Sequence, residues 1–479
     1  MDLESGVGLL HALTSYAPGR EWDVPPDDPR VRQDLKPNDP ATLPPQVKTY
    51  PDGLPTVALP RELPDPGVPA AAVLSGKPSP PQPLDAAQLG RVLFLGAGVV
   101  RTSDRNGRSW LFRASGSAGA RFPLEVYAVT SGVAGVEDGI HWYDPVAHAL
   151  VRVGPNARGD ATTLVITGIP WRTGWRYSER GFRHLYWDAG TLLAQLDAAA
   201  ASAGLDHRLR TDFPDDAVRA LVGADGVHEF PLALLTFGPG TPALEATGPA
   251  TAGELPEVEF PLVTAAQRAG DGTVLGDPWP VGDEVAAPAL STETVDSVVR
   301  RRGSQRRMDR SKTLPREALD WPMAAALRGI DVPHWVAVHG VDGVEPGIYR
   351  WPDLANPITT GDLRDELERV SLGQSLSAEA AYVVIAAADP GNLDDRAYRS
   401  AQLAAGLVEG RLHLAAYAIG ASATGMTFLD SEVPALLHEP DDLVTLLFTC
   451  VGVPEYKSRA GGLPGSPVEV GRVMPRTVD

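Results

Sequence analysis

The sequence predicts an α+β protein made of two tandem copies of one fold within a single chain of 479 residues. Three observations predict it. Apolar runs with strand patterns alternate with Ala/Leu-rich helical patterns, as expected for sheets covered by helices. Four segments of the first half recur in the same order in the second half. A stretch filled with proline and glycine separates the two halves.

The internal repeat is the most informative of these observations. The segment 188–205, an Ala/Leu-rich stretch long and apolar enough for a buried helix, aligns with residues 404–421. The other aligned segments and positions are 135–144 with 343–352, 212–222 with 427–437, 232–238 with 446–452, Gly190 with Gly406, Gly204 with Gly420, Phe213 with Phe428, and Val218 with Val433. Because four matches occur in order, we expect the two copies to form an intramolecular pseudo-dimer.

Composition divides the chain into four parts. The boundaries are 1–88 for a proline-rich N-terminal arm, 89–240 for a first domain, 241–290 for a linker, and 291–479 for a second domain with a tail. In each domain we expect an antiparallel-rich mixed sheet flanked by helices.

The bulk composition excludes several classes of protein. A formal net charge of −19 argues against a general nucleic-acid binder. The sequence contains no run of 18 apolar residues, so it predicts no membrane span. Its acidic N-terminus lacks the layout of a signal peptide, and we therefore expect a cytoplasmic protein. The ten histidines show no metal-binding spacing, and the single Cys450, in an apolar strand-like run, is expected to be a buried structural thiol.

An arginine cluster at residues 301–309 stands out against this acidic background. Arg302, Ser304 and Arg306 occupy alternating positions of an extended segment, so their side chains point to one face. Two guanidinium groups and a hydroxyl on one face favour a phosphate site, because guanidinium groups bind phosphate oxygens in pairs. The alternative interpretation is a solvated basic face in front of a helix predicted over residues 315–329.

Two further segments carry chemistry of the same kind. Lys457 and Arg459 follow the last predicted strand of the second half, where a strand end can deliver side chains to a cleft. The alternative for them is a polar tail segment. In the first half, a loop of small residues precedes a predicted strand and lets backbone amides approach a ligand closely, unless it is a simple turn. Its candidate residues are Arg113, Ser115, Ser117, Ala118 and Gly119.

Together these motifs resemble the FMN-dependent nitroreductase fold and, within it, the SagB-type (McbC- and ThcOx-like) peptide azoline dehydrogenases. The family pattern of an arginine followed by P-S-A-G-A-x-x-P-x-E-x-Y corresponds to RASGSAGARFPLEVY at residues 113–127. The pattern G-L-Y-x-Y-D-P-x-x-H-x-L corresponds to GIHWYDPVAHAL at residues 139–150, and LLHALTSY at residues 9–16 resembles the opening of the family. The resemblance covers most of residues 89–238 and 295–460.

The resemblance implies a dimeric enzyme with flavin at the interface, where the basic segments come from one subunit and the small-residue loop from the other. Here the first half has the loop but lacks arginine at residues 74–84, and it has no basic pair after its last strand. The second half has both basic segments but no such loop at residues 326–340. Because a buried phosphate dianion without cations is too costly, we expect one complete FMN site per chain and one lost site.

The resemblance also suggests further flavin contacts and a catalytic pair. Gln374, Thr424 and Gly425 match flavin-facing positions, with strand-flanking loops as the alternative. The Lys-Tyr pair of the family, in a K-Y-x-x-R-x-[YF]-R context, corresponds to RYSERGFR, so Tyr177 matches and Arg176 replaces the lysine. Desaturation of an azoline needs a base, and arginine keeps its proton, so Arg176 is expected to act by lowering the pKa of Tyr177. The alternative is that this segment only forms the polar start of the long helix.

The resemblance therefore implies an FMN-dependent dehydrogenase or oxidase that converts thiazoline or oxazoline rings of a ribosomal peptide precursor to azoles. A peptide substrate, a cyclodehydratase complex and molecular oxygen would be its partners. Two alternatives stay open: an NAD(P)H-dependent nitro- or ene-type reductase of a small molecule, and a flavin-free scaffold in a biosynthetic complex. The replacement at Arg176 and the missing proline before Ser117 favour the scaffold.

Overall fold

The computed structural model describes residues 1–4, 6–21, 28–32, 34–105, 107–255, 257–288 and 291–471. The end of the expected tail, residues 472–479, lies outside the described residues, as do short parts of the arm and of the linker.

The first half folds around a seven-stranded sheet in which every neighbouring pair of strands is antiparallel. In spatial order its strands are β1 (Thr56–Ala58), β6 (Ala149–Gly154), β5 (Gly139–Asp144), β4 (Leu124–Thr130), β8 (Thr163–Gly168), β10 (Phe230–Phe237) and β9 (His207–Arg210). The long central strands consist almost entirely of buried residues because both faces are covered.

The second half folds around a six-stranded sheet, which is also antiparallel throughout. Its strands are β14 (Thr359–Thr360), β13 (Gly347–Arg350), β12 (His334–Val338), β15 (Tyr382–Ala388), β17 (Val444–Gly452) and β16 (Ser422–Met426). The order β13-β12-β15-β17-β16 repeats the order β5-β4-β8-β10-β9 of the first half. The two halves therefore share one strand topology.

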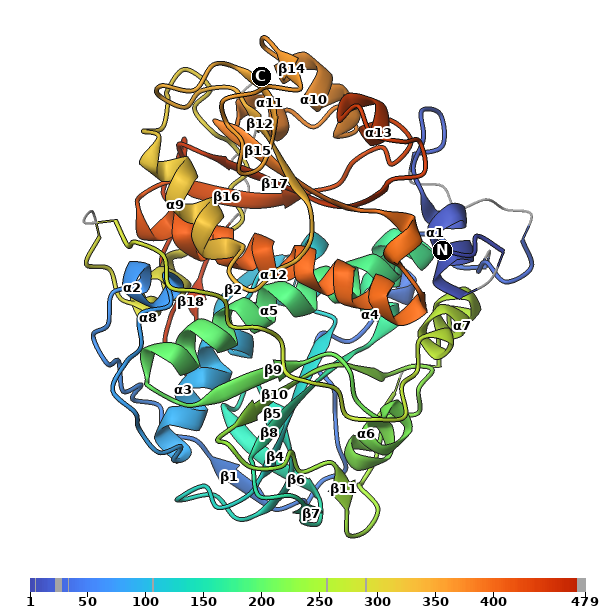
Figure 1. Ribbon diagram of the computed structural model, residues 1–479. Coiled ribbons are helices and arrows are strands. Elements are labelled where there is room, and N and C mark those ends of the chain that lie inside the picture. The colour runs from blue at the N-terminus through green and yellow to red at the C-terminus, as the bar shows by residue number, and fades with distance from the viewer. Residues whose placement is uncertain are drawn as a thin grey trace.

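Two long helices run side by side between the two sheets, as Figure 1 shows. They are α5 (Gly181–Ser202) and α12 (Asp395–Ala418). They cross at Gly190 and Gly406, where a Cβ atom on Gly190 would lie 2.3 Å from the backbone N of Leu407, and one on Gly406 would lie 2.3 Å from the carbonyl O of Trp187. Only glycine permits this approach of the two backbones.

The remaining elements surround this centre. The other helices are α1 (Gly6–Thr14), α2 (Ala70–Leu74), α3 (Ala86–Ala97), α4 (Pro170–Tyr177), α6 (Asp215–Val222), α7 (Pro261–Ala269), α8 (Val295–Arg301), α9 (Glu317–Ala326), α10 (Arg364–Val370), α11 (Leu376–Glu379) and α13 (Val433–Leu436), with 3-10 turns η1 (Pro40–Thr42), η2 (Ala118–Ala120), η3 (Ser178–Arg180) and η4 (Pro390–Asn392). The smaller sheets contain β2 (Val99–Arg105), β3 (Arg108–Arg113) and β18 (Val468–Glu469), and β7 (Ala157–Arg158) with β11 (Glu245–Ala246).

All four aligned segments of the repeat fall on equivalent elements of the two halves. The aligned glycines Gly190 and Gly406 meet at the helix crossing. Gly204 and Gly420 follow the ends of α5 and α12 with φ of +68° and +82°, the left-handed conformation that favours glycine after a helix. Phe213 and Phe428 are both buried. The repeat predicted from the sequence therefore agrees with the strand order and the helix ends.

The structure differs from the expected organisation in three respects. The sheets of the two halves are purely antiparallel rather than mixed, and the parallel pair β18–β2 belongs to a separate three-stranded sheet that joins the end of the chain to the first half. Within residues 1–88, β1 adds an edge strand to the first sheet. Within residues 241–290, β11 and α7 pack on the first half. Backbone pairing holds β1 and β11, whereas α7 packs through the apolar side chains of Leu262, Val263 and Ala266.

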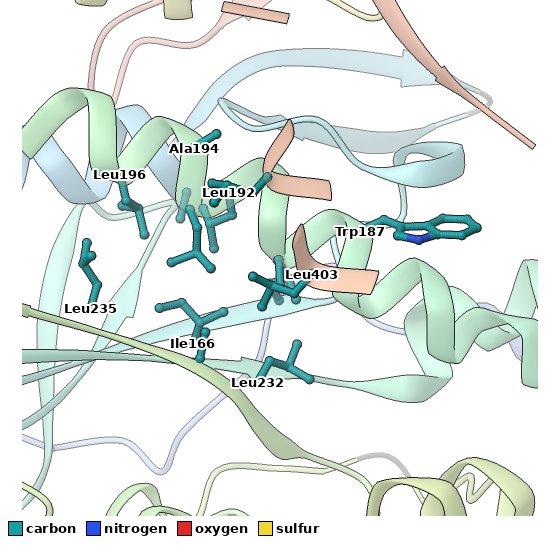
Figure 2. Close-up of a cluster of buried hydrophobic side chains, with 14 of the residues drawn as sticks. Ile166, Trp187, Leu192, Ala194, Leu196, Leu232, Leu235 and Leu403 are labelled. Carbon is teal, nitrogen blue, oxygen red and sulfur yellow. The ribbon is translucent and has the colours of Figure 1, made fainter. Parts of the chain in front are cut away.

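The largest core lies between the first sheet and α5. Figure 2 shows Ile166, Leu232 and Leu235 of the strands facing Leu192 and Leu196 of the helix. Cys450 is buried in β17, and burial raises the pKa of its thiol, which confirms a structural thiol. None of the helices in the described ranges is both long and apolar enough to cross a membrane.

Candidate active site

Two adjoining cavities lie where the halves meet, with volumes of about 690 and 220 Å³. They share four lining residues, Gly116, Ser117, Ser304 and Arg306. Every site residue expected from the sequence lines at least one of them. The larger cavity receives Arg113, Ser115, Ser117, Arg302, Ser304, Arg306, Lys457 and Arg459, and the smaller receives Ser117, Ala118, Gly119, Arg176, Tyr177, Ser304, Arg306, Gln374, Thr424 and Gly425.

Arg302 crosses from the second half to the loop of the first half. It follows the last residue of α8 and is 4 % exposed. Its Nε and Nη2 donate to the carbonyl O of Ala114 at 3.1 and 2.6 Å. Its Nη1 is buried and has no partner among the described residues. A buried guanidinium N–H without an acceptor at a cavity wall favours an anionic ligand there.

The larger cavity is strongly cationic. Besides Arg302, the side chains of Arg306 and Lys457 are exposed and form no bond within the described ranges, and Arg459 donates to the carbonyl O of Glu469 at 2.9 Å. None of the described residues that line this cavity is acidic. In a chain with a net charge of −19, this concentration of positive charge attracts an anion.

Arg113 contributes less charge to this cavity than the sequence suggests. Its Nη2 lies 3.9 Å from a carboxylate O of the buried Glu125 and donates to the carbonyl O of Gln46 at 3.2 Å. Its charge is therefore balanced inside the first half. Arg113 shapes the wall, and the second half supplies Arg302, Arg306 and Lys457, which have no acidic partner within hydrogen-bond distance among the described residues.

The small-residue loop is held in place by a buried carboxylate of α5. Asp188 accepts from the hydroxyl of Ser117 at 2.6 Å and from the amide N of Ala118 at 2.9 Å. The same hydroxyl accepts from the amide of Phe122 at 2.8 Å. The hydroxyl of Ser117 is therefore occupied in fixing the loop, whereas the amides of Gly116 and Ser117 donate to no group in the described part of the chain.

Burial raises the pKa of Asp188 to about 8, and the nearby charge of Glu409 contributes. Glu409 on α12 accepts from the hydroxyl of Thr191 at 2.7 Å. A Cβ on Gly425 would lie 3.3 Å from a carboxylate oxygen of Glu409. Asp188, Thr191 and Glu409 were not expected as site residues. The signal that could have found them is their polarity at buried positions in the middle of two long helices.

Tyr177 ends α4 beside the loop. A Cβ on Gly119, which has φ of +58°, would lie 2.7 Å from the Tyr177 hydroxyl. The phenol ring stacks on His184 with ring centres 4.1 Å apart, and the guanidinium carbon of Arg176 lies 5.8 Å from the ring centre. Arg176 lowers the pKa of Tyr177 as expected, but burial raises it more, and the pKa of Tyr177 is raised overall. Arg176 therefore has the expected effect on the pKa of Tyr177, but this effect is too small to bring the pKa below that of an ordinary tyrosine.

The three candidates near β15 and β16 differ in what their side chains do. The hydroxyl of Thr424 donates to the carbonyl O of Gln305 at 2.6 Å, and this bond fixes β16 against residues 301–309. Gln374 donates to the carbonyl O of Ser371 at 3.2 Å. Gly425 presents its backbone to the smaller cavity. The Thr424 hydroxyl is engaged within the protein, whereas the backbone of β16 and the side-chain oxygen of Gln374 remain available to a ligand.

A second unexpected group lies behind the smaller cavity. Asp430 is buried and accepts from Arg180 Nη1 at 2.7 Å and from Arg183 Nη1 at 2.5 Å. The two guanidinium groups hold the pKa of Asp430 well below its usual range, against the effect of burial. The amide of Tyr16 donates to the same carboxylate at 2.8 Å, so the arm, the first half and the second half meet at one ion cluster.

The corresponding region of the other half lacks the key features of this site. Leu209 pairs with Leu235 in the first sheet, and Gly425 pairs with Thr449 in the second. Leu209 therefore takes the position of Gly425. By the helix alignment, Leu193 takes the position of Glu409. These leucines line a separate cavity of about 500 Å³. Their side chains occupy the positions of the glycine and the carboxylate.

Comparison with known proteins gives the following relatives. No family model matches the chain. A Methanocaldococcus jannaschii protein described as a "putative nitroreductase" is 30% identical over 171 residues, which cover 33% of this chain and 81% of that protein. A crystal structure of a "putative nitroreductase" from Anabaena variabilis is 21% identical, has a TM-score of 0.70, and covers 94% of this chain and 100% of its own. One from Ralstonia eutropha is 20% identical with a TM-score of 0.31, covering 43% of this chain and 97% of its own.

Proposed function

The chain belongs to the nitroreductase family, and on that premise we propose that it is an oxidoreductase that binds one FMN in the two adjoining cavities. The observation that carries this proposal is the cationic larger cavity, with the unpartnered Nη1 of Arg302 at its wall and no acidic residue among its described lining. FMN carries a phosphate dianion, which such a cavity suits.

The residues present fit the cofactor at both ends. Arg302, Arg306 and Lys457 would hold the phosphate, because their side chains keep donors that no described residue uses. The free amides of Gly116 and Ser117 would donate to the edge of the flavin ring, as backbone amides do in anion and ring cradles. When bound, FMN supplies the acceptor and donor of a hydride, and the protein supplies binding, orientation and protons.

One FMN per chain follows from the difference between the halves. Leu209 and Leu193 stand where the site has Gly425 and Glu409, so a flavin ring in the counterpart cavity would clash with side chains. The loop that would correspond to residues 301–309 is 74–84, which contains no arginine. A phosphate there would lack the pair of guanidinium groups that segment 301–309 offers to its oxygens.

For the substrate, we propose a thiazoline or oxazoline ring of a ribosomal peptide, oxidised to an azole with molecular oxygen as the final electron acceptor and a cyclodehydratase complex as partner. Support comes from Tyr177, which lines the smaller cavity at the position matching the catalytic tyrosine of the azoline dehydrogenases. Asp188, with a pKa of about 8, is a stronger base than an ordinary carboxylate and lines the same cavity. A proton removed from carbon would have an acceptor there.

The raised pKa of Tyr177 favours a second candidate function. A protonated phenol beside the flavin site suits the donation of a proton, which is the need of an NAD(P)H-dependent nitro- or ene-type reductase. The two functions use the same flavin site and differ in the direction of electron flow. Rapid anaerobic bleaching of the flavin by NAD(P)H would favour the reductase, and bleaching by an azoline peptide alone would favour the dehydrogenase.

Flavin stoichiometry tests the proposal directly. We expect the purified full-length protein to be yellow and to release about one FMN per chain on heating, measured by flavin fluorescence against protein concentration. A colourless protein that fails to bind added FMN would contradict the proposal and favour a flavin-free scaffold. Two FMN per chain would contradict the lost counterpart site but not the cofactor.

Tyr177→Phe tests the catalytic assignment. We expect this variant to keep its FMN and to lose about 10²- to 10⁴-fold in turnover, the usual contribution of a positioned proton-transfer group. Turnover is measured with the substrate that bleaches the flavin. The matched control is Tyr349→Phe, whose hydroxyl bonds only the carbonyl of Glu345, away from both cavities. Full turnover in the Tyr177→Phe variant would remove this residue from the mechanism.

A further inference from the structure

The counterpart cavity has not closed, although its flavin features are gone. It keeps a volume of about 500 Å³, which lies in the range of cavities that bind small organic molecules. Like the smaller flavin cavity, it is lined by both central helices. Leu193 of α5 is aligned with Glu409 of the flavin site, and Leu407 of α12 is aligned with Thr191. The two polar residues are thus replaced by leucines.

The interior of the counterpart cavity is apolar. The residues that make it so come from both central helices, from the edge of the first sheet and from the segment before β12, and they are Leu193, Leu205, Leu209, Leu235, Ile330 and Leu407. The linker supplies an outer wall. Trp279 donates its amide to the carbonyl O of Leu209 at 2.8 Å and its indole N–H to the hydroxyl of Thr211 at 2.8 Å. These bonds fix the wall in place.

The rim of the cavity carries more positive than negative charge. Lys77, Arg208, Arg328 and Arg411 line it, against Asp197 and Asp206. The two carboxylates are already paired. Asp197 bonds His207 at 2.9 Å and lies 3.8 Å from Arg411, and Asp206 lies 3.3 Å from Arg208.

Two of the rim cations, Lys77 and Arg328, form no ion pair with any described residue. Lys77 is exposed and its ammonium bonds no group within the described residues. Arg328 donates only to backbone carbonyls, including those of Asp283 at 2.7 Å and Leu74 at 3.2 Å. The carboxylates of Asp197, Asp283 and Glu284 act on its charge only through space, without a direct ion pair. A surplus of cations above an apolar interior selects a ligand with one negative end and an apolar body.

We propose that this cavity is a second binding site that takes a small amphipathic anion, with an aliphatic or aromatic body in the apolar interior and a carboxylate or sulfonate at the rim near Lys77 and Arg328. The site is separate from the flavin cavities and uses none of their residues. The proposal therefore stands or falls independently of FMN binding.

The experiment uses the full-length protein and 8-anilinonaphthalene-1-sulfonate, an amphipathic anion that fluoresces when bound in apolar surroundings. We expect its fluorescence to rise and to saturate at about one probe per chain. Octanoate is expected to displace the probe, and 1-octanol, which has the same chain without the charge, to be at least about tenfold weaker. Equal displacement by octanol would overturn the anionic character of the site.

Two variants locate the probe. Ala201 lines the cavity from α5, so Ala201→Phe fills it and is expected to weaken probe binding about tenfold or more. Lys77→Glu, at an exposed position, is expected to weaken it several-fold, while the matched variant Lys36→Glu, at an exposed lysine outside the cavity, changes nothing. Visible flavin absorbance should stay constant in all three.

The proposal is overturned if the probe stays dark, if Ala201→Phe and Lys77→Glu bind it as the unaltered protein does, or if the probe expels flavin. If Ala201→Phe does not fold, Lys77→Glu against Lys36→Glu decides alone, because neither exposed lysine supports the core. A colourless protein that still binds the probe would contradict the proposed flavin function and leave the second site standing.

Discussion

The Arg302→Ala variant is expected to fold and to be colourless. Arg302 is the one arginine of its cluster that is buried at the cavity wall, and its guanidinium also joins the second half to the loop through the carbonyl of Ala114. Loss of a buried, charge-assisted contact costs about 2–5 kcal/mol. That is roughly 30-fold or more in the dissociation constant for FMN, since every 1.4 kcal/mol is tenfold.

The measurement is a titration of the apoprotein with FMN, followed by quenching of flavin fluorescence. The matched control is Arg307→Ala: Arg307 is in the same segment, but its guanidinium pairs with Glu455 at 2.8 Å and is half exposed, so FMN affinity should not change. Circular dichroism establishes that both variants are folded. An Arg302→Ala protein that stays yellow with unchanged affinity would refute the phosphate assignment.

The second large effect is expected at the helix crossing. In Gly406→Ala the new methyl group would lie 2.3 Å from the carbonyl O of Trp187 and 2.6 Å from its Cα, which are backbone atoms and cannot rotate away. α5 and α12 must therefore separate, at a cost of about 3 kcal/mol or more. This loss exceeds the gain of about 1 kcal/mol that alanine brings to a helix over glycine.

Chemical denaturation of the variant checks this expectation, with the free energy of unfolding as the readout. Gly248→Ala is the matched control, because a Cβ there would meet only a side-chain carbon of Pro155 at 3.4 Å, an ordinary contact. A Gly406→Ala protein as stable as this control would show that the two helices do not pack as tightly as described.

The sequence could predict whatever depends on local pattern and on the repeat. The aligned glycines Gly190 and Gly406 already marked equivalent points of two buried helices, and their contact follows if the two copies pack symmetrically. The residues brought together in the cavities were predictable for the same reason. The motifs of the two halves are complementary, and a pseudo-dimer places the loop of one half against the arginines of the other.

What the sequence could not supply is pairing between distant residues and the effect of burial on charge. Nothing local in Asp430 shows that it binds Arg180 and Arg183, which lie about 250 positions earlier in the chain. The pKa of Tyr177 depends on two opposing effects, and only the structure shows that burial outweighs Arg176. The parallel pair β18–β2 could not be predicted either, because β18 has only two residues and lies far from β2 in the sequence.

The fusion of two like halves into one chain has a consequence for how the protein can change. In a dimer of identical subunits each mutation is inherited by both sites, so a leucine at the position of Gly425 would block both. Here the same position is encoded twice, as Gly425 and as Leu209, so the two copies can differ. An asymmetric division of labour between the two sides thus needs no second gene, and each side can be redesigned without altering the other.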